Sequence, residues 1–221
     1  MKSTRVFLLP LIVALCTQCR LNISDERLEA ASKTLGDTIS VDSFNFQRDS
    51  DSTLKGWTGI QDNGEFIPLP PGWEVRVADR KLYQEAVASP PNSADSIECV
   101  TFARWENDAP SSHNYAFARQ LANNAFSPFH VTSDTLKKLV FQHDFGVERI
   151  AGFLAQKKAY KGYCLAYVND SCTYRFCIIL SEDRLKNYQG KLVADIVGNI
   201  QINHKDFLMN DNPLKQIIRL H

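Results

Sequence analysis

The stretch GYCLAYV (residues 162–168), the polar residues NDSC (169–172) and the stretch TYRFCIIL (173–180) decide the fold. Both apolar runs are rich in β-branched and aromatic residues, and the residues between them favour a turn, so a β-hairpin is predicted. If Val168 lies opposite Thr173, one face carries cross-strand pairs of aromatic and branched side chains, which stabilise a sheet. A shift by one residue would place Arg175 among them, so the pattern selects a single register.

The same register places Cys164 directly opposite Cys177, and two interpretations of this pair remain open. Two free thiols can fill space in a core as small apolar side chains. Alternatively, the pair can form a cross-strand disulfide, which requires Cβ atoms within about 4.5 Å of each other. The sequence does not decide between them, because it does not show whether the two cysteines form a hydrogen-bonded pair or a non-hydrogen-bonded pair.

An amphipathic helix is predicted directly after the hairpin. Ser181 is expected to be its N-cap, and Glu182 and Asp183 lie in the first turn, where the helix dipole favours negative charge. Gly198-Asn199 is expected to end the helix, and residues 200–202 could add a short edge strand. Apolar residues at helical spacing form one stripe that is expected to cover the aromatic face of the hairpin. This stripe comprises Leu185, Tyr188, Leu192, Val193, Ile196 and Ile200.

The residues before the hairpin predict further strands, one loop and one helix. Proline cannot donate a hydrogen bond to a neighbouring strand, so the proline-rich residues 66–73 are expected at a sheet edge. The helix is expected to start after Ser111 or Ser112 and to end before Pro128. The predicted elements are a strand at 73–77, a loop at 81–94, a central strand at 97–105, a helix at 114–126, and strands at 136–141 and 147–156.

Four parts of the chain are predicted. Residues 1–19 form a leader, residues 20–65 an N-terminal arm, residues 66–202 an α+β domain, and residues 203–221 a C-terminal tail. The domain is expected to begin after Asp62-Asn63-Gly64, which is a strong turn signal. The tail either docks on the domain through a terminal turn or extends from it.

The leader has the features of an export signal. Lys2 and Arg5 give it a positive start, and the apolar run 6–15 is too short to span a bilayer as a mature helix. Export across the membrane is therefore predicted, which places the protein in the cell envelope, facing the periplasm, or outside the cell. A bacterial source is favoured by the leader alone.

Two cysteines close the leader and are candidates for lipidation. Residues 13–16 resemble a bacterial lipoprotein box, in which Cys16 would become the lipidated first residue, although Leu15 stands where a small residue is usual. Cys19 is the alternative, and simple cleavage and release is a third outcome. Cys16 and Cys19 have thioredoxin-like spacing, but no strand and helix surround them, so redox chemistry is not predicted there.

The composition fits a single globular domain. The formal charge is zero, with 25 basic and 25 acidic residues, so nothing suggests general attraction to nucleic acid or to an acidic membrane surface. Contact with a membrane is expected only through a lipid anchor. Four cysteines remain after the leader, an even number that permits disulfides in an oxidising compartment.

No catalytic, cofactor-binding or metal site is predicted. The sequence contains none of the common motifs of hydrolases, zinc proteases, P-loop proteins or dinucleotide-binding proteins. His113, His130 and His143 are too scattered to suggest a local metal set. A serine hydrolase that uses Ser111 or Ser112 with His143 and Asp144 remains an alternative without a motif, so a binding protein is favoured over an enzyme.

The order of elements resembles the family that includes the photosystem extrinsic protein PsbP and the Mog-type Ran-binding factors. The resemblance rests on PPGWEV (residues 70–75) and ADIVGNIQI (194–202), and it covers roughly residues 66 to 202. It implies an α+β fold in which helices sandwich an antiparallel sheet (an α/β/α sandwich). Family members are mostly accessory or binding proteins, which implies the same here, and no functional residues carry over.

The expected function is therefore that of an exported, non-catalytic binding or accessory protein of the bacterial cell envelope. Its partner would be another envelope protein or a small ligand. A small exported hydrolase and a self-associating structural envelope protein are the competing hypotheses.

Overall fold

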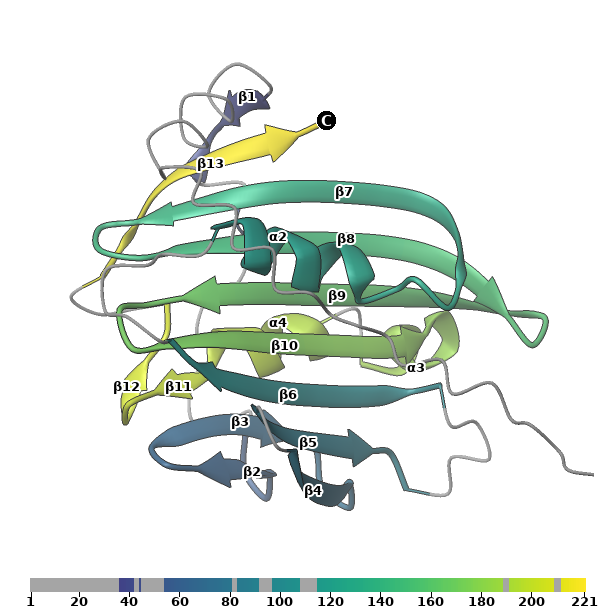
Figure 1. Ribbon diagram of the computed structural model, residues 1–221. Helices are drawn as coiled ribbons and strands as arrows, with labels where there is room; N and C mark the ends of the chain where they lie inside the picture. The colour runs from purple at the N-terminus through teal and green to yellow at the C-terminus, as the bar shows by residue number, and fades with distance from the viewer. Residues whose placement is uncertain are drawn as a thin grey trace, which may run out of the picture.

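The structure is a computed structural model that describes residues 36–41, 44, 54–80, 83–91, 97–107, 115–188, 191–208 and 212–221. Antiparallel strands dominate it (Figure 1). The described elements are β1 (Gly36–Ile39), β2 (Thr58–Asp62), β3 (Glu65–Leu69), β4 (Glu74–Arg80), β5 (Tyr83–Ser89), β6 (Cys99–Glu106), α2 (Tyr115–Asn124), β7 (His130–Phe141), β8 (Phe145–Ala155), β9 (Lys158–Val168), β10 (Cys172–Ser181), α3 (Glu182–Asn187), α4 (Leu192–Gly198), β11 (Gln201–Ile202), β12 (Lys205–Asp206) and β13 (Leu214–Leu220).

The described strands form two sheets. The large sheet has nine strands in the order β1-β13-β7-β8-β9-β10-β6-β5-β4, and the small sheet has four in the order β12-β11-β3-β2. In the large sheet, long neighbouring strands pair as consecutive hairpins from β7 to β10.

The predicted hairpin is confirmed with its register. Strands β9 and β10 pair with Val168 opposite Thr173, Phe176 opposite Leu165 and Cys177 opposite Cys164. Strand β10 also pairs with β6, so the predicted central strand does lie inside the sheet. The aromatic pattern therefore fixed the register correctly.

Side chains alternate between two hydrophobic cores, one on each face of the large sheet. Helix α2 covers one face, where it packs on β8, β9 and β10. On the other face, Tyr163, Leu165 and Phe176 belong to one cluster with residues of α4 and of the small sheet. The sheet is thus buried on both faces in its centre, which explains why β9 is almost entirely buried.

Helix α2 is held on its face by an unusually close contact with β9. The ring of Phe126, just after the helix, is fully buried against the backbone at Gly162. A Cβ atom at position 162 would lie 2.3 Å from Cε1 of Phe126, so only glycine leaves room for the ring. Arg149 of β8 adds a polar contact, because its guanidinium donates to the carbonyl oxygen of Asn123 at 2.5 Å.

The predicted α/β/α sandwich is wrong, because the chain is largely β. The described helices are three short ones, and the face opposite α2 is covered by the small sheet together with α4, not by one long helix. The difference arises because several segments that the sequence analysis placed in loops and tails are strands.

The helix expected after the hairpin is divided into two shorter helices. Ser181 is the N-cap of α3, as predicted, and its hydroxyl accepts a hydrogen bond from the Arg184 N–H. Helix α3 ends at Asn187, and α4 starts at Leu192. Tyr188, expected in the buried stripe, is 37% exposed, whereas Leu192 and Ile196 of α4 are fully buried.

The predicted boundaries of the domain also differ from the structure. Residues 81–94 were expected to be a loop, but β5 lies there between β4 and β6. The predicted tail contributes β12 and β13, and the predicted arm contributes β1 and β2. Asn63 and Gly64 do form the predicted turn, with φ of 42° and 98°, but this turn joins β2 to β3 inside the small sheet.

Several predicted features lie outside the described residues. These are the leader with Cys16 and Cys19, and the residues Ser111, Ser112 and His113.

Candidate functional site

Polar side chains gather at the end of the large sheet where β7 turns into β8. The Asp144 carboxylate accepts hydrogen bonds from the Tyr167 hydroxyl and the Asn212 amide, and Asn212 also donates to the Tyr167 oxygen at 3.2 Å. Burial and the neighbouring Asp144 raise the pKa of Tyr167 far above its ordinary value. Tyr167 therefore stays protonated, and the three side chains tie the β7–β8 turn to the start of β13.

This arrangement does not favour the hydrolase hypothesis. The side chain of His143 is exposed, and its backbone N–H donates to Oδ1 of Asn212 at 2.8 Å. Asp144 turns its carboxylate to Tyr167 and Asn212, where it has a structural role. The predicted nucleophiles Ser111 and Ser112 lie outside the described residues.

A second polar cluster lies between the two sheets. Glu65, at the start of β3, is 2% exposed, and its Oε1 accepts a hydrogen bond from the Tyr174 hydroxyl at 3.2 Å. Nη1 of Arg104 lies 4.0 Å from Oε2 of Glu65, while Nε of the same residue donates to Sγ of Cys172 at 3.3 Å. Burial raises the pKa of Glu65, and the nearby Arg104 opposes this. The cluster joins the small sheet to β6 and β10.

A third cluster is an ion pair inside the large sheet. Glu148 of β8 is fully buried, and Nζ of Lys137 on β7 lies 2.8 Å from its Oε2. Burial raises the pKa of Glu148, and Lys137 opposes this rise. Burial and the nearby Glu148 also raise the pKa of Tyr163. In all three clusters, the polar and charged groups contact one another inside the protein.

Three thiols lie on the α2 side of the sheet. Cys164 and Cys177 are opposite each other, as predicted, and both are free and buried. Cys99 lies nearby on β6, and burial raises its pKa to about 12. A disulfide between Cys164 and Cys177 stays a prediction. A raised pKa leaves little thiolate at neutral pH, so Cys99 is a poor nucleophile.

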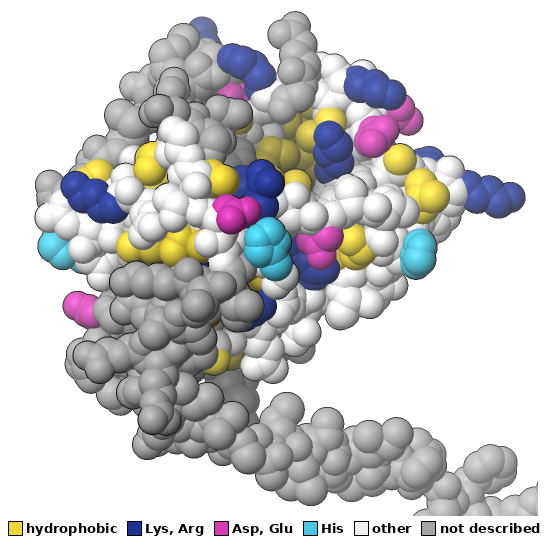
Figure 2. Space-filling view, turned by 90° about the horizontal axis from the view of Figure 1, so that it is seen from above, with side chains coloured by type: hydrophobic (Ala, Val, Ile, Leu, Met, Phe, Trp, Pro, Cys, Tyr) yellow, Lys and Arg dark blue, Asp and Glu magenta, His cyan; other side chains and the backbone are white. Residues whose placement is uncertain are grey.

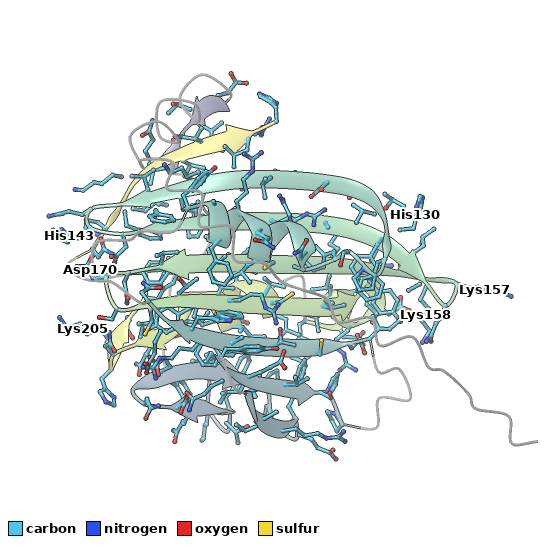
Figure 3. All side chains as sticks on the ribbon, in the orientation of Figure 1. His130, His143, Lys157, Lys158, Asp170 and Lys205 are labelled. Atoms are coloured by element: carbon cyan, nitrogen blue, oxygen red, sulfur yellow. The ribbon has the colours of Figure 1, made fainter. Side chains whose placement is uncertain are left out.

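The described histidines do not form a metal site. His130 begins β7 and His143 follows its other end, so they lie at opposite ends of the molecule (Figure 3). Within the described ranges, no group of three or more histidine, cysteine, aspartate or glutamate residues could hold a metal ion. On the face seen in Figure 2, basic and acidic side chains are interspersed.

A partly exposed group of aromatic and charged side chains lies where the large sheet extends beyond α2. The rings of Tyr83 and Trp105 are stacked, with their centroids 4.9 Å apart. The ring of Phe117 on α2 meets the Trp105 ring edge-on, with a centroid distance of 5.6 Å. The Arg175 guanidinium lies 5.7 Å from the Trp105 ring centre. Nη2 of Arg175 lies 3.4 Å from Oε1 of Glu85. We call Tyr83, Glu85, Trp105, Phe117 and Arg175 the aromatic platform.

The backbone register explains how the platform is built. Arg175 of β10 and Glu85 of β5 both pair with Ala103 of β6, so they flank the same small side chain from opposite sides. Because Ala103 is short, the arginine can reach across β6 to the glutamate. Every side chain of the platform is only partly buried. Arginine and aromatic residues are enriched at binding interfaces, so the platform is the candidate functional site.

The platform was not predicted from the sequence. Tyr83 and Glu85 were assigned to a loop, which hid their place beside Trp105. The alternation of Ala86 and Ala88 with Glu85 and Val87 is the available signal, but alanine is a weak strand former and the alternation is easily overlooked.

No helix in the described part of the chain is long and apolar enough to cross a membrane.

Comparison with known proteins gave no family. No family model matches the chain, and no curated protein matches it. Among solved structures, the chain is similar to the crystal structure of a protein of unknown function, PA94 from Pseudomonas aeruginosa. The two share 11% identity over 63% of this chain and 94% of that chain, with a TM-score of 0.31. A likeness this weak carries no argument, and the resemblance to the PsbP and Mog family stays a prediction.

Proposed function

We propose that this protein is an exported, non-catalytic binding or accessory protein of the bacterial cell envelope that binds another envelope protein at the aromatic platform. The observation that carries the proposal is the partly exposed Tyr83–Trp105 stack beside the Arg175–Glu85 pair. Aromatic rings offer large contact areas at low conformational cost, and an adjacent arginine adds directional hydrogen bonds.

Two further observations support the proposal. The positive start and short apolar run of residues 1–15 are typical of an export signal. The buried carboxylates and tyrosines contact each other and hold strands together, which is a structural use of groups that catalysis would need to expose.

Export and anchoring are tested by cell fractionation and intact mass. The expected result is envelope protein from which at least residues 1–15 have been removed, and incorporation of labelled palmitate if Cys16 or Cys19 is lipidated. A cytoplasmic protein that retains residues 1–19 would contradict the proposal. Covalent labelling of the exported protein by a fluorophosphonate, which reacts with activated serines, would contradict its non-catalytic part.

The binding site is tested by photo-crosslinking in living cells. Replacing Tyr83 with benzoylphenylalanine keeps an aromatic ring in the platform and should yield one dominant cross-linked partner. The matched control carries the same residue at Leu154, which is 57% exposed on the distant β8–β9 hairpin. Equal cross-linking patterns at the two positions would overturn the assignment of the platform.

A further inference from the structure

Strand β4 is an outer edge of the large sheet. It pairs with β5 through seven consecutive residue pairs without a bulge, from Glu74–Ser89 to Arg80–Tyr83. Among the described residues, no strand pairs with its other side, and Figure 1 shows it at the lower end of the sheet. Such an edge presents free backbone N–H and C=O groups that can pair with another strand.

The edge lacks most of the features that prevent pairing. It is not short, and it contains no proline and no bulge; the opposite edge strand, β1, has four residues. Two of its side chains are apolar and exposed: Val75 is 39% exposed and Val77 is 69% exposed. Exposed β-branched side chains on an unpaired edge favour strand addition.

The sequence of β4 suits pairing with itself. The strand reads EVRVADR, with two acidic and two basic residues, and it starts with an acidic residue and ends with a basic one. Antiparallel pairing of two copies therefore brings the acidic start of each strand beside the basic end of the other. Opposite charges in such cross-strand positions are stabilising.

Symmetry, charge and the number of paired residues together favour one register. Suppose that two copies of β4 pair about a two-fold axis and continue the sheet. One residue of β4 then lies opposite the same residue of the second copy, because directly paired residues must place their side chains on the same face of the sheet. Centring the axis on Arg76 would place two guanidinium groups side by side, which is repulsive. Centring it on Val77 pairs all seven residues, places valine on valine and sets Arg76 opposite the small Ala78.

We propose that β4 is the interface of a homodimer in which two large sheets join edge to edge, with Val77 of one chain directly opposite Val77 of the second copy. This inference is independent of the proposed function, because the aromatic platform and the outer edge of β4 are different surfaces.

The self-opposed position of Val77 gives a sharp test by sedimentation equilibrium on the full chain. Wild-type protein is expected to dimerise with increasing concentration. Val77→Lys and Val77→Glu should each weaken dimerisation roughly tenfold or more, because each places two like charges opposite one another. An equal mixture of the two variants should restore dimers, because lysine then faces glutamate.

The control variant is Leu154→Lys, which makes the same change at an exposed residue of another hairpin and should leave dimerisation unchanged. Circular dichroism should show both Val77 variants folded, since the side chain is mostly exposed. A wild-type protein that stays monomeric at all concentrations would overturn the proposal. So would dimers that survive Val77→Lys, or a mixture of variants that does not associate.

Discussion

Two glutamates whose carboxylates lie inside the protein, Glu65 and Glu148, have different surroundings. The nearest cation of Glu148 is 2.8 Å away, whereas Nη1 of Arg104 lies 4.0 Å from Glu65. Burial raises the pKa of both groups. Glu65, whose cation is the more distant one, is therefore the glutamate whose charge is less well compensated by its ion pair.

We expect the stability contributed by Glu65 to fall as pH rises. Its pKa in the folded protein is raised above the ordinary 4.5, so this contribution is fully present below pH 4.5 and is lost through the raised pKa. The free energy of unfolding of Glu65→Gln should therefore increase relative to that of wild type as pH rises from 4.5 to 7.5, because only the wild-type protein has to bury a charged carboxylate there. Urea denaturation of both proteins at several pH values in this range measures the difference between their free energies of unfolding.

The control is Glu106→Gln, because the Glu106 side chain is 86% exposed and lies 3.8 Å from the same arginine. The difference in free energy of unfolding from wild type should change more with pH for Glu65→Gln than for this exposed control. If the difference in free energy of unfolding between Glu65→Gln and wild type stays constant or decreases as pH rises, burial does not raise the pKa of Glu65.

The contact between Gly162 and Phe126 predicts a steric penalty. Gly162→Ala should lower the free energy of unfolding by about 1–3 kcal/mol, because the new methyl group would overlap the buried ring of Phe126. Combining it with Phe126→Leu should cost less than the sum of the two single changes, as chemical denaturation can measure. Purely additive costs would mean that the two positions do not compete for the same space.

At the scale of the elements, the β9–β10 hairpin makes a prediction about its cysteines. The register places Cys164 and Cys177 opposite each other with both thiols buried. After export, transfer of their two hydrogens to an external disulfide should link them, and closing a loop of this size stabilises by roughly 3 kcal/mol. Peptide mass mapping of the exported protein should find the linked pair.

The matched variant Cys172→Ser leaves this pair intact and should not change the result, whereas Cys177→Ser should abolish it. Two alkylatable thiols at Cys164 and Cys177 in the unfolded exported protein would show instead that the pair only fills space in the core.

How far the sequence predicts these elements depends on what each strand contacts. Strands β9 and β10 carry aromatic side chains on one face, so one register is clearly better than the others. Strand β13 was missed because Ile217 and Ile218 are adjacent and each is buried in a different core. Such a strand shows no polar alternation, and its burial depends on neighbours far away in the sequence.

The same limit applies to the candidate site. Trp105 was placed correctly in a central strand, but Tyr83 comes from a strand that was expected to be a loop. The strand of Arg175 was predicted, but not its pairing with β6, which brings Arg175 beside Trp105. Long-range pairing decides which side chains meet, so residue types alone could predict the platform's chemistry but not its members.

At the scale of the whole molecule, β13 lies between β1 and β7 in the sheet. Ending the chain after Pro213 should therefore unfold or aggregate the protein, because it removes the buried Ile217 and Ile218 and exposes the edge of β7. Removing only His221, which is exposed, should be tolerated. Solubility and circular dichroism measure both; a folded protein without residues 214–221 would contradict the role of β13.

The position of β13 also has a consequence for how the chain acquires its shape. Strand β7 is synthesised long before its neighbour β13, and the sheet cannot close on that side until residues 214–220 have left the ribosome. Contacts between distant parts of a chain form slowly. A chain that completes its sheet so late should stay unfolded for longer during synthesis, and the export that we propose would require this state, because an export channel threads an unfolded chain.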